Sequence, residues 1–230
     1  MLEGALEDWF YEVKARRAQL EAAALAEVRR WVWFKGLTCP LDPEPFRWER
    51  AGLRLARKVP CPGALPSARV GHFECGLDDA ERLVVQRQYA TEASPSVELV
   101  FHRPAVIRTV RFADVDHDFT PPHGVRELRL EEGRVVEKAG YSNLAMWPRR
   151  ELTPADIAAL KEAPAHLRTV LHERFIWEAG RLVRAEMLGH AWVVVSHLEF
   201  KPNGRLLRVW RPNPRTPSGR QLMWGKKLDA

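Results

Sequence analysis

Cysteine is scarce in this chain, with three residues in 230 and no Cys-x-x-Cys pair. An odd number of cysteines without paired spacing argues against a disulfide framework. No apolar run approaches the roughly 18 residues that a membrane-spanning helix needs. Glu3, Glu7 and Asp8 stand where a secretory signal would carry Lys or Arg. We therefore expect a cytoplasmic protein that does not enter a membrane.

The best-attested catalytic signatures are also missing. The sequence contains no Gly-x-Ser-x-Gly, no phosphate-binding P-loop, no Gly-x-Gly-x-x-Gly and no His-Glu-x-x-His. These motifs would point to a hydrolase, a nucleotide-binding enzyme or a zinc protease. Their absence inclines the interpretation away from an enzyme, and no cofactor is predicted.

The composition is that of a folded protein. Hydrophobic residues make up 46% of the chain, and it contains nine tryptophans, which argues against disorder. A chain of 230 residues fits one large domain or two small ones. We expect a single folding unit, because the first 36 residues cannot form a core alone.

The N-terminal third divides into two segments. Apolar residues at three- and four-residue steps predict one amphipathic helix from Leu2 to about Phe34, within a helical region 1–36 that ends at Gly36. Residues 37–69 are rich in proline and predict an irregular connection with one short strand near Arg47–Lys58.

From residue 70 to the end, the hydrophobic pattern has the period of two that is typical of strands. One helix, over 153–163, interrupts this region: Thr153 is its N-cap and Pro154 its first residue. The predicted strands are Val70–Cys75, Arg82–Ala90, Val97–Arg103, Val106–Ala113, Val125–Leu130, Arg134–Ala139, Thr169–Trp177, Arg181–Leu188, Trp192–Phe200, Arg205–Arg211 and Gln221–Trp224.

A repeated hairpin sets the topology. A short strand, a turn that ends in Gly-Arg and a returning strand recur around Gly133, Gly180 and Gly204. Glycine suits such turns because it adopts a positive φ without a Cβ clash. Consecutive hairpins predict an α+β, β-rich fold, an antiparallel meander that is curved and packed by the two helices. A closed barrel and an open wrapped sheet both remain possible at this level.

Positive charge is concentrated at the C-terminal end. From Lys201 to Lys227 the chain carries eight basic residues and no acidic one, whereas the remaining 28 basic and 30 acidic residues leave the rest at −2. Cations displace the counterions of nucleic acids, and flat aromatic rings stack on unpaired bases. The segment predicts a binding surface for an anionic partner, either nucleic acid or an acidic protein, or else ordinary strands with solvated arginines. Its candidate residues are Arg205, Arg208, Trp210, Arg211, Arg215, Arg220, Trp224, Lys226 and Lys227.

A second cluster combines carboxylates with imidazoles. Such a set could hold a divalent metal and activate water for hydrolysis, with His102 nearby across a hairpin. It does not match a calcium loop, because Phe119 and Val125 stand where that loop needs glycine and glutamate. The simpler interpretation is a polar loop with aspartates that cap turns. The candidate catalytic residues are Asp114, Asp116, His117, Asp118 and His123.

The cysteines and one histidine contain the ligand types of a Cys₃His zinc site. Only His72 and Cys75 have suitable spacing, and Cys39 and Cys61 lack paired partners. Residues three apart on a strand point to opposite faces. We therefore expect no metal here and interpret the cysteines as buried thiols.

Three classes of function follow from these observations. The favoured interpretation is a binding protein that presents the C-terminal arginines and tryptophans to an anionic partner. A small metal-assisted hydrolase centred on residues 114–123 is the second. The third is a structural or regulatory protein that forms a homo-oligomer through its N-terminal helix.

Overall fold

A computed structural model describes residues 2–36, 38–92, 95–112, 123–143, 153–162, 168–188, 193–203, 205–216 and 218–225. All the strands belong to one antiparallel sheet with the order β13-β12-β11-β10-β9-β8-β7-β6-β5-β4-β3-β1-β2. From β3 to β13 each strand pairs with the next along the chain, so the predicted meander is confirmed. The strands are β1 (Arg30–Lys35), β2 (Arg57–Val59), β3 (His72–Leu77), β4 (Leu83–Tyr89), β5 (Ser96–Arg103), β6 (Val106–Phe112), β7 (His123–Glu131), β8 (Arg134–Asn143), β9 (Arg168–Glu178), β10 (Arg181–Leu188), β11 (Val193–Phe200), β12 (Leu206–Pro212) and β13 (Arg220–Gly225).

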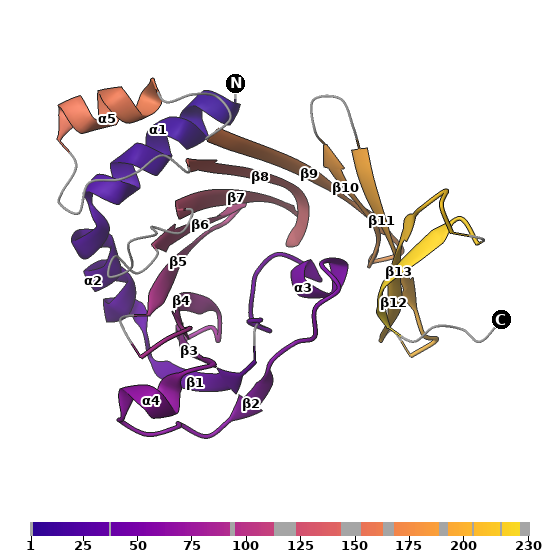
Figure 1. The fold of residues 1–230 in the computed structure, drawn as a ribbon, viewed down its shortest axis with the longest axis horizontal. Coiled ribbons are helices and arrows are strands. Elements are labelled where there is room, and N and C mark those ends of the chain that lie inside the picture. The colour runs from indigo at the N-terminus through magenta and orange to yellow at the C-terminus, as the bar shows by residue number, and fades with distance from the viewer. Residues whose placement is uncertain are drawn as a thin grey trace.

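The sheet is strongly curved and open (Figure 1). Its two edges, β2 and β13, are not paired with each other in the described part of the chain. The curvature gives the sheet an inner, concave face and an outer, convex face. Of the two architectures that the sequence left possible, the structure has the open wrapped sheet.

Three helices cover part of the outer face: α1 (Leu2–Ala15), α2 (Arg17–Glu27) and α5 (Pro154–Lys161). Helix α1 packs against β6, β7 and β8, and α2 packs against β4 and β5. The buried apolar side chains between these layers include Leu6, Phe10, Leu99, Val110 and Tyr141. None of the helices in the described residues is long and apolar enough to cross a membrane.

The expected helix from Leu2 to Phe34 is three elements in the structure. The helix breaks at Arg16, between α1 and α2, and the chain becomes extended at Val28. The run Trp31-Val-Trp-Phe34 then belongs to β1, which pairs with β2 and β3. Aromatic and β-branched residues fit a half-buried strand, and pairing on both sides outweighs the helical spacing.

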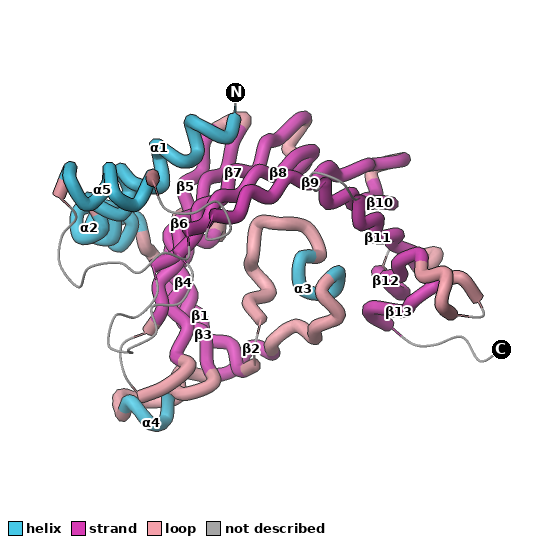
Figure 2. Tube along the Cα trace, turned by 45° about the horizontal axis from the view of Figure 1, so that its top comes forward, coloured by secondary structure: helices cyan, strands magenta, loops and turns pink. Residues whose placement is uncertain are grey.

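The proline-rich segment also differs from expectation, because residues 38–56, the inner segment, lie inside the concave face (Figures 1 and 2). A one-turn helix, α3 (Arg47–Arg50), replaces the strand expected near Arg47–Lys58, and only the short β2 follows. A second short helix is α4 (Pro66–Arg69). Buried apolar residues of the inner face, among them Phe73, Leu128 and Val209, form a second core with Cys39 and Ala56 of the inner segment.

Two of the predicted hairpin turns contain two consecutive residues with positive φ, although the sequence predicted only the glycine to have one. Glu131 pairs with Arg134, and both residues between them, Glu132 and Gly133, have positive φ angles of 50° and 74°. Ala179 and Gly180 repeat this pattern at 45° and 77°. These are two-residue turns in which both central residues are left-handed, the geometry that matches the twist of paired strands. Gly204 lies outside the described residues.

Candidate functional site

The C-terminal strands β12 and β13 form one edge of the sheet, away from the helices that cover β4–β8. Side chains alternate along β12, so Arg208 and Trp210 point to the outer face, whereas Val209 and Arg211 point to the inner face. Val209 is fully buried in the inner core. The guanidinium of Arg211 donates to Ser196 Oγ and to the carbonyl oxygen of Arg50, each at 3.0 Å.

An aromatic and cationic stack occupies the outer face. The rings of Trp210 and His197 are nearly parallel, at 9°, with centroids 4.1 Å apart. The guanidinium carbon of Arg220 lies 4.3 Å from the centroid of Trp210, within the range of a cation–π interaction. Burial, together with Arg184 and Arg220, lowers the pKa of His197, so its ring is neutral at pH 7.

One carboxylate orders this stack. Glu199 accepts hydrogen bonds from Arg208 Nε at 2.5 Å and from Trp210 Nε1 at 2.8 Å. Its Oε1 also lies 4.0 Å from an Nη1 atom of Arg220. Two guanidinium groups therefore share a single carboxylate, and the cluster keeps a surplus positive charge.

The other candidate residues of this segment are distributed differently. Arg205 and Arg215 are exposed near opposite ends of β12, and no ion pair to either is found within the described residues. Arg211 lies on the other face, as described above. The side chain of Trp224 and residues Lys226 and Lys227 are outside the described part of the chain.

His197 of the stack and the carboxylate Glu199 beside it were not assigned to this surface from the sequence. They belong to β11 and lie directly opposite Trp210 and Arg208 in the β11–β12 register. That register includes a bulge between Glu199 and Phe200. A basic-residue count cannot find a neutral imidazole and a carboxylate that reach the surface through strand pairing.

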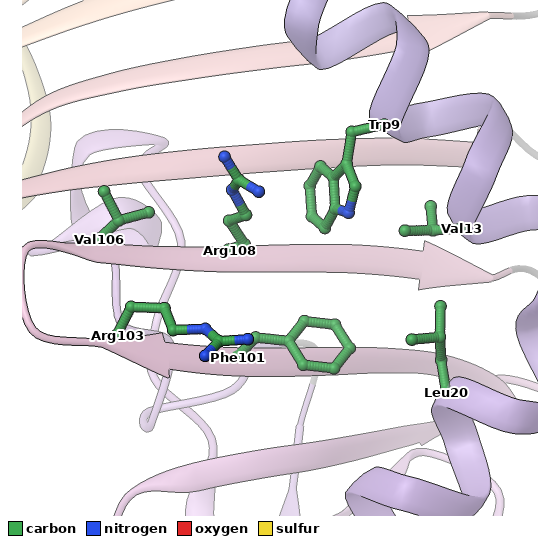
Figure 3. A pocket seen from close by; sticks show the side chains of 7 residues that line it. All are labelled: Trp9, Val13, Leu20, Phe101, Arg103, Val106 and Arg108. Carbon is green, nitrogen blue, oxygen red and sulfur yellow. The ribbon is translucent and has the colours of Figure 1, made fainter.

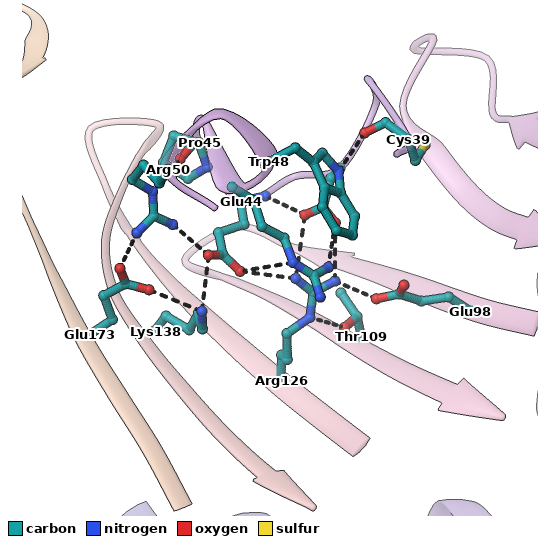
Figure 4. Close-up of polar contacts among 12 residues, drawn as sticks. Cys39, Glu44, Pro45, Trp48, Arg50, Glu98, Thr109, Arg126, Lys138 and Glu173 are labelled. Carbon is teal, nitrogen blue, oxygen red and sulfur yellow. Dashed lines mark hydrogen bonds and ion pairs between the residues drawn. The ribbon is translucent and has the colours of Figure 1, made fainter. Parts of the chain in front are cut away.

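A buried charge network lies between the inner segment and the inner face of the sheet (Figure 4). Glu44 accepts hydrogen bonds from Arg50 at 2.5 Å and from Lys138 at 2.9 Å. Glu173 of β9 accepts from the same two residues, with 3.0 Å between Lys138 Nζ and Glu173 Oε2. These four side chains form a closed, alternating ring of charges.

The network continues through Arg126 of β7. Its guanidinium pairs with Glu98 and lies 3.0 Å from Glu44 Oε2, while its Nε donates to Thr109 Oγ1 at 3.0 Å. Asp42 is also within reach, at 3.4 Å from Arg126 Nη1. Burial alone would raise the pKa of Glu98, but the facing arginines, Arg126 first, lower it to about 2.

This network is best explained as a structural device. The carboxylates of Asp42, Glu44, Glu98 and Glu173 are each held by cations from Arg47, Arg50, Arg126 and Lys138. Partners from both the inner segment and the sheet contribute, so the network fixes the segment against the concave face. Side chains that are already paired in this way have little capacity left for a ligand.

One carboxylate of the inner segment stands apart from the network. Glu49 is only 7% exposed and lines a cavity of about 240 Å³ together with Phe46 and Trp48. No other described side chain donates a hydrogen bond to its carboxylate. Burial raises the pKa of Glu49, with smaller opposing effects from its own backbone N–H and from Arg50.

The expectation of buried thiols holds for two of the three cysteines and is wrong for Cys61. Cys39 and Cys75 are buried with their Sγ atoms 3.6 Å apart, whereas Cys61 is exposed. His72 directs its Nδ1 to the carbonyl oxygens of Arg69 and Val70. In the part of the chain that the structure describes, no three His, Cys, Asp or Glu side chains are grouped to hold a metal ion.

The candidate hydrolase residues Asp114, Asp116, His117 and Asp118 lie outside the described residues. His123 is the first residue of β7, for which only the backbone is described. His102 of β5 directs its Nε2 to the carbonyl oxygen of Leu83 at 2.9 Å.

The apolar residues of the N-terminal helix, which a homo-oligomer would use, contact the protein's own sheet. Leu6, Phe10 and Val13 are each no more than 3% exposed. They pack in the outer core with side chains of β4–β8. This part of the helix surface is therefore already covered within one chain.

Comparison with known proteins adds no relative to this description. No family model, no curated protein and no solved structure matches the chain.

Proposed function

We propose that the protein is a binding module that holds single-stranded nucleic acid on the outer face of β11–β13. The observation that carries this proposal is the stack of His197, Trp210 and Arg220, which lies beside Arg208 and carries surplus positive charge. Among the described helices, α1 and α2 pack on β4–β8, and α3 contacts β12 and β13 from the inner segment. We call the outer surface formed by Arg205, Arg208, Trp210, Arg215 and Arg220 the C-terminal cationic face.

The spacing of the cations favours a long anion. Strand β12 has seven residues and is therefore roughly 20 Å long at about 3.3 Å per residue. Lys201 and Arg205 lie at the turn before it, and Arg215 lies in the loop after it. A chain of phosphates could follow this strand and meet cations at both ends, which a single small anion could not do.

The stack supplies the second requirement of a single-strand binder. The side chain of Arg220 is 56% exposed and covers one region of the Trp210 ring. Bases stack on guanidinium planes as well as on aromatic rings. A base could therefore rest on Arg220, with Trp210 and His197 behind it as a rigid support.

The test is fluorescence anisotropy with a labelled oligothymidine at several salt concentrations. The triple variant Arg205→Ala, Arg215→Ala, Arg220→Ala should bind at least tenfold more weakly at low salt. Its plot of log affinity against log salt should lose about 2 from its slope, because each phosphate contact on a single strand contributes roughly 0.7.

A matched control removes three exposed cations from the edge strand β2 and from the end of the inner segment just before it: Arg54→Ala, Arg57→Ala, Lys58→Ala. This variant loses the same charge and should bind the oligonucleotide like the unmodified protein. An equal loss in both triple variants would reduce the binding to net charge and overturn the proposal. Tighter binding to polyglutamate than to the oligonucleotide would reassign the partner to an acidic protein.

A further inference from the structure

A groove opens on the outer face over β5 and β6 (Figure 3). Four strands separate it from β11–β13, which carry the C-terminal cationic face. Its floor is the hairpin of β5 and β6, and its wall comes from α1 and α2, which part at Arg16. Its volume is about 350 Å³, within the range of roughly 300 to 1,000 Å³ that is typical of sites for small ligands.

The lining is mainly apolar and partly exposed. Phe101 lies on the floor and Trp9 projects from α1 on the other side, so the two aromatic rings border the same hollow (Figure 3). Leu20 and Val106 are also only partly buried. When a ligand ring displaces water from an exposed aromatic surface, the free energy of the system falls, which favours binding.

Two arginines give the groove its polarity. Arg103 and Arg108 lie toward the hairpin, whereas the aliphatic side chains of α1 and α2 lie at the other end (Figure 3). Arg108 directs its Nε and one Nη to Glu127, each at 2.8 Å, which leaves the second Nη. Its guanidinium carbon also lies 5.3 Å from the centroid of the Trp9 ring, so Arg108 borders one side of that ring. Arg103 is exposed and has no ion pair within the described residues. None of the described lining residues is acidic.

We propose that this groove binds a small aromatic carboxylate. The ring lies between Trp9 and Phe101, and the carboxylate accepts hydrogen bonds from Arg103 and from the remaining Nη of Arg108. Guanidinium groups bind carboxylates with strong, charge-assisted hydrogen bonds. The volume accommodates roughly a dozen water-sized groups at about 30 Å³ each, which corresponds to two fused rings with one carboxylate.

The probe is 2-naphthoate, titrated calorimetrically into the full chain, with uncharged 2-naphthamide as its matched control. A ligand of this size in an open groove should have a dissociation constant between about 10 μM and 1 mM. Arg103→Gln should weaken naphthoate binding at least fivefold and leave the amide unchanged. Arg57→Gln, an exposed arginine on β2, should change neither.

Two further variants place the probe in the groove. Naphthoate should quench part of the tryptophan fluorescence, and Trp9→Phe should abolish that part. Val106→Glu, which adds a carboxylate at the hairpin end, should weaken naphthoate more than naphthamide.

The proposal is overturned if naphthoate does not bind, if the acid and the amide bind equally, or if Arg103→Gln retains full affinity for naphthoate. It stands apart from the proposed nucleic-acid function. The triple variant of Arg205, Arg215 and Arg220 should therefore bind naphthoate normally, and Arg103→Gln should bind the oligonucleotide normally.

Discussion

Lys138 of β8 and Glu173 of β9 occupy directly opposite positions on neighbouring strands, and their Nζ and Oε2 atoms are 3.0 Å apart. Both residues are buried, at 9% and 3% exposure. Each also contacts a residue of the inner segment, Lys138 through Glu44 and Glu173 through Arg50. The pair therefore joins the register of the sheet to the position of the segment inside it.

Removal of one charged side chain from the buried ring of Glu44, Arg50, Lys138 and Glu173 should lower the free energy of unfolding. Glu173→Ala leaves Lys138 and Arg50 buried with one carboxylate between them, and breaking a buried ion pair costs about 3 to 5 kcal/mol. Urea unfolding followed by tryptophan fluorescence measures the loss. The control is Glu131→Ala, which breaks an exposed pair with Arg129 and should cost less than about 1 kcal/mol. Equal losses in the two variants would contradict a structural role for the network.

The same network should make the protein sensitive to acid. The pKa of Glu98 is lowered to about 2 against an ordinary 4.5, and the pKa of Glu44 is lowered further. Between the folded and unfolded pKa values, the unfolded chain binds more protons than the folded one. The contribution of these carboxylates to the free energy of unfolding is therefore complete above pH 4.5 and falls as the pH decreases toward 2. Glu98 alone should contribute about 3 kcal/mol over this interval.

Urea midpoints at pH 7, 5, 4 and 3 would measure this dependence. Glu98→Gln should be less stable at pH 7 and should show a flatter decline between pH 5 and pH 3. An unchanged slope in this variant would show that other carboxylates govern acid unfolding.

Much of the sheet could be predicted because its contacts are local. All eleven strands expected after residue 70 correspond to β3–β13, since each pairs with its neighbour in sequence. The turns at Gly133 and Gly180 could be predicted from a few neighbouring residues, because glycine adopts the positive φ that such turns require. The prediction for the N-terminal region was wrong because its decisive contacts are distant in sequence. Trp31–Phe34 becomes a strand because it pairs with β2 and β3, which follow about 25 and 40 residues later in the chain.

In the candidate sites, too, local relationships could be predicted and long-range ones could not. Arg208 and Trp210 could be assigned to one face because strand residues two apart share a face, and the same rule separates Arg211 from them. The buried network could not be predicted, because Glu44, Arg126 and Glu173 meet only when the inner segment enters the concave face. The groove likewise depends on the break at Arg16, which the continuous helical spacing conceals.

Glu49 should respond to pH in the opposite direction to Glu98. Its pKa is raised by burial, so the folded state prefers the protonated carboxyl, and its contribution to stability is lost as the pH rises through the folded pKa. Glu49→Gln keeps the shape without the charge and should raise the free energy of unfolding at pH 7 by about 1 kcal/mol. At pH 4 the variant and the unmodified protein should be equally stable. A destabilised Glu49→Gln at pH 7 would reveal a cationic partner for this carboxylate.

Gly76 of β3 should not tolerate a side chain. A Cβ there would lie 2.7 Å from Cγ2 of Val28 and 3.2 Å from the ring of Trp31. Val28 is β-branched and has little rotamer freedom with which to move away. Gly76→Ala should therefore cost about 1 to 3 kcal/mol. The control is Gly124→Ala in β7, where the nearest atom is 3.6 Å away and the change should stay within about 0.5 kcal/mol.

The three thiols should differ in reactivity according to their burial. Cys39 and Cys75 are buried, and the contact with Cys39, followed by burial, raises the pKa of the Cys75 thiol. Because the thiolate is the reactive form, a maleimide at pH 7 should modify only Cys61 in the folded protein. Mass spectrometry should show one adduct under native conditions, none in Cys61→Ser, and three in 6 M guanidinium chloride for the unmodified chain. Protection of Cys61 in the folded protein would contradict its exposure in the structure.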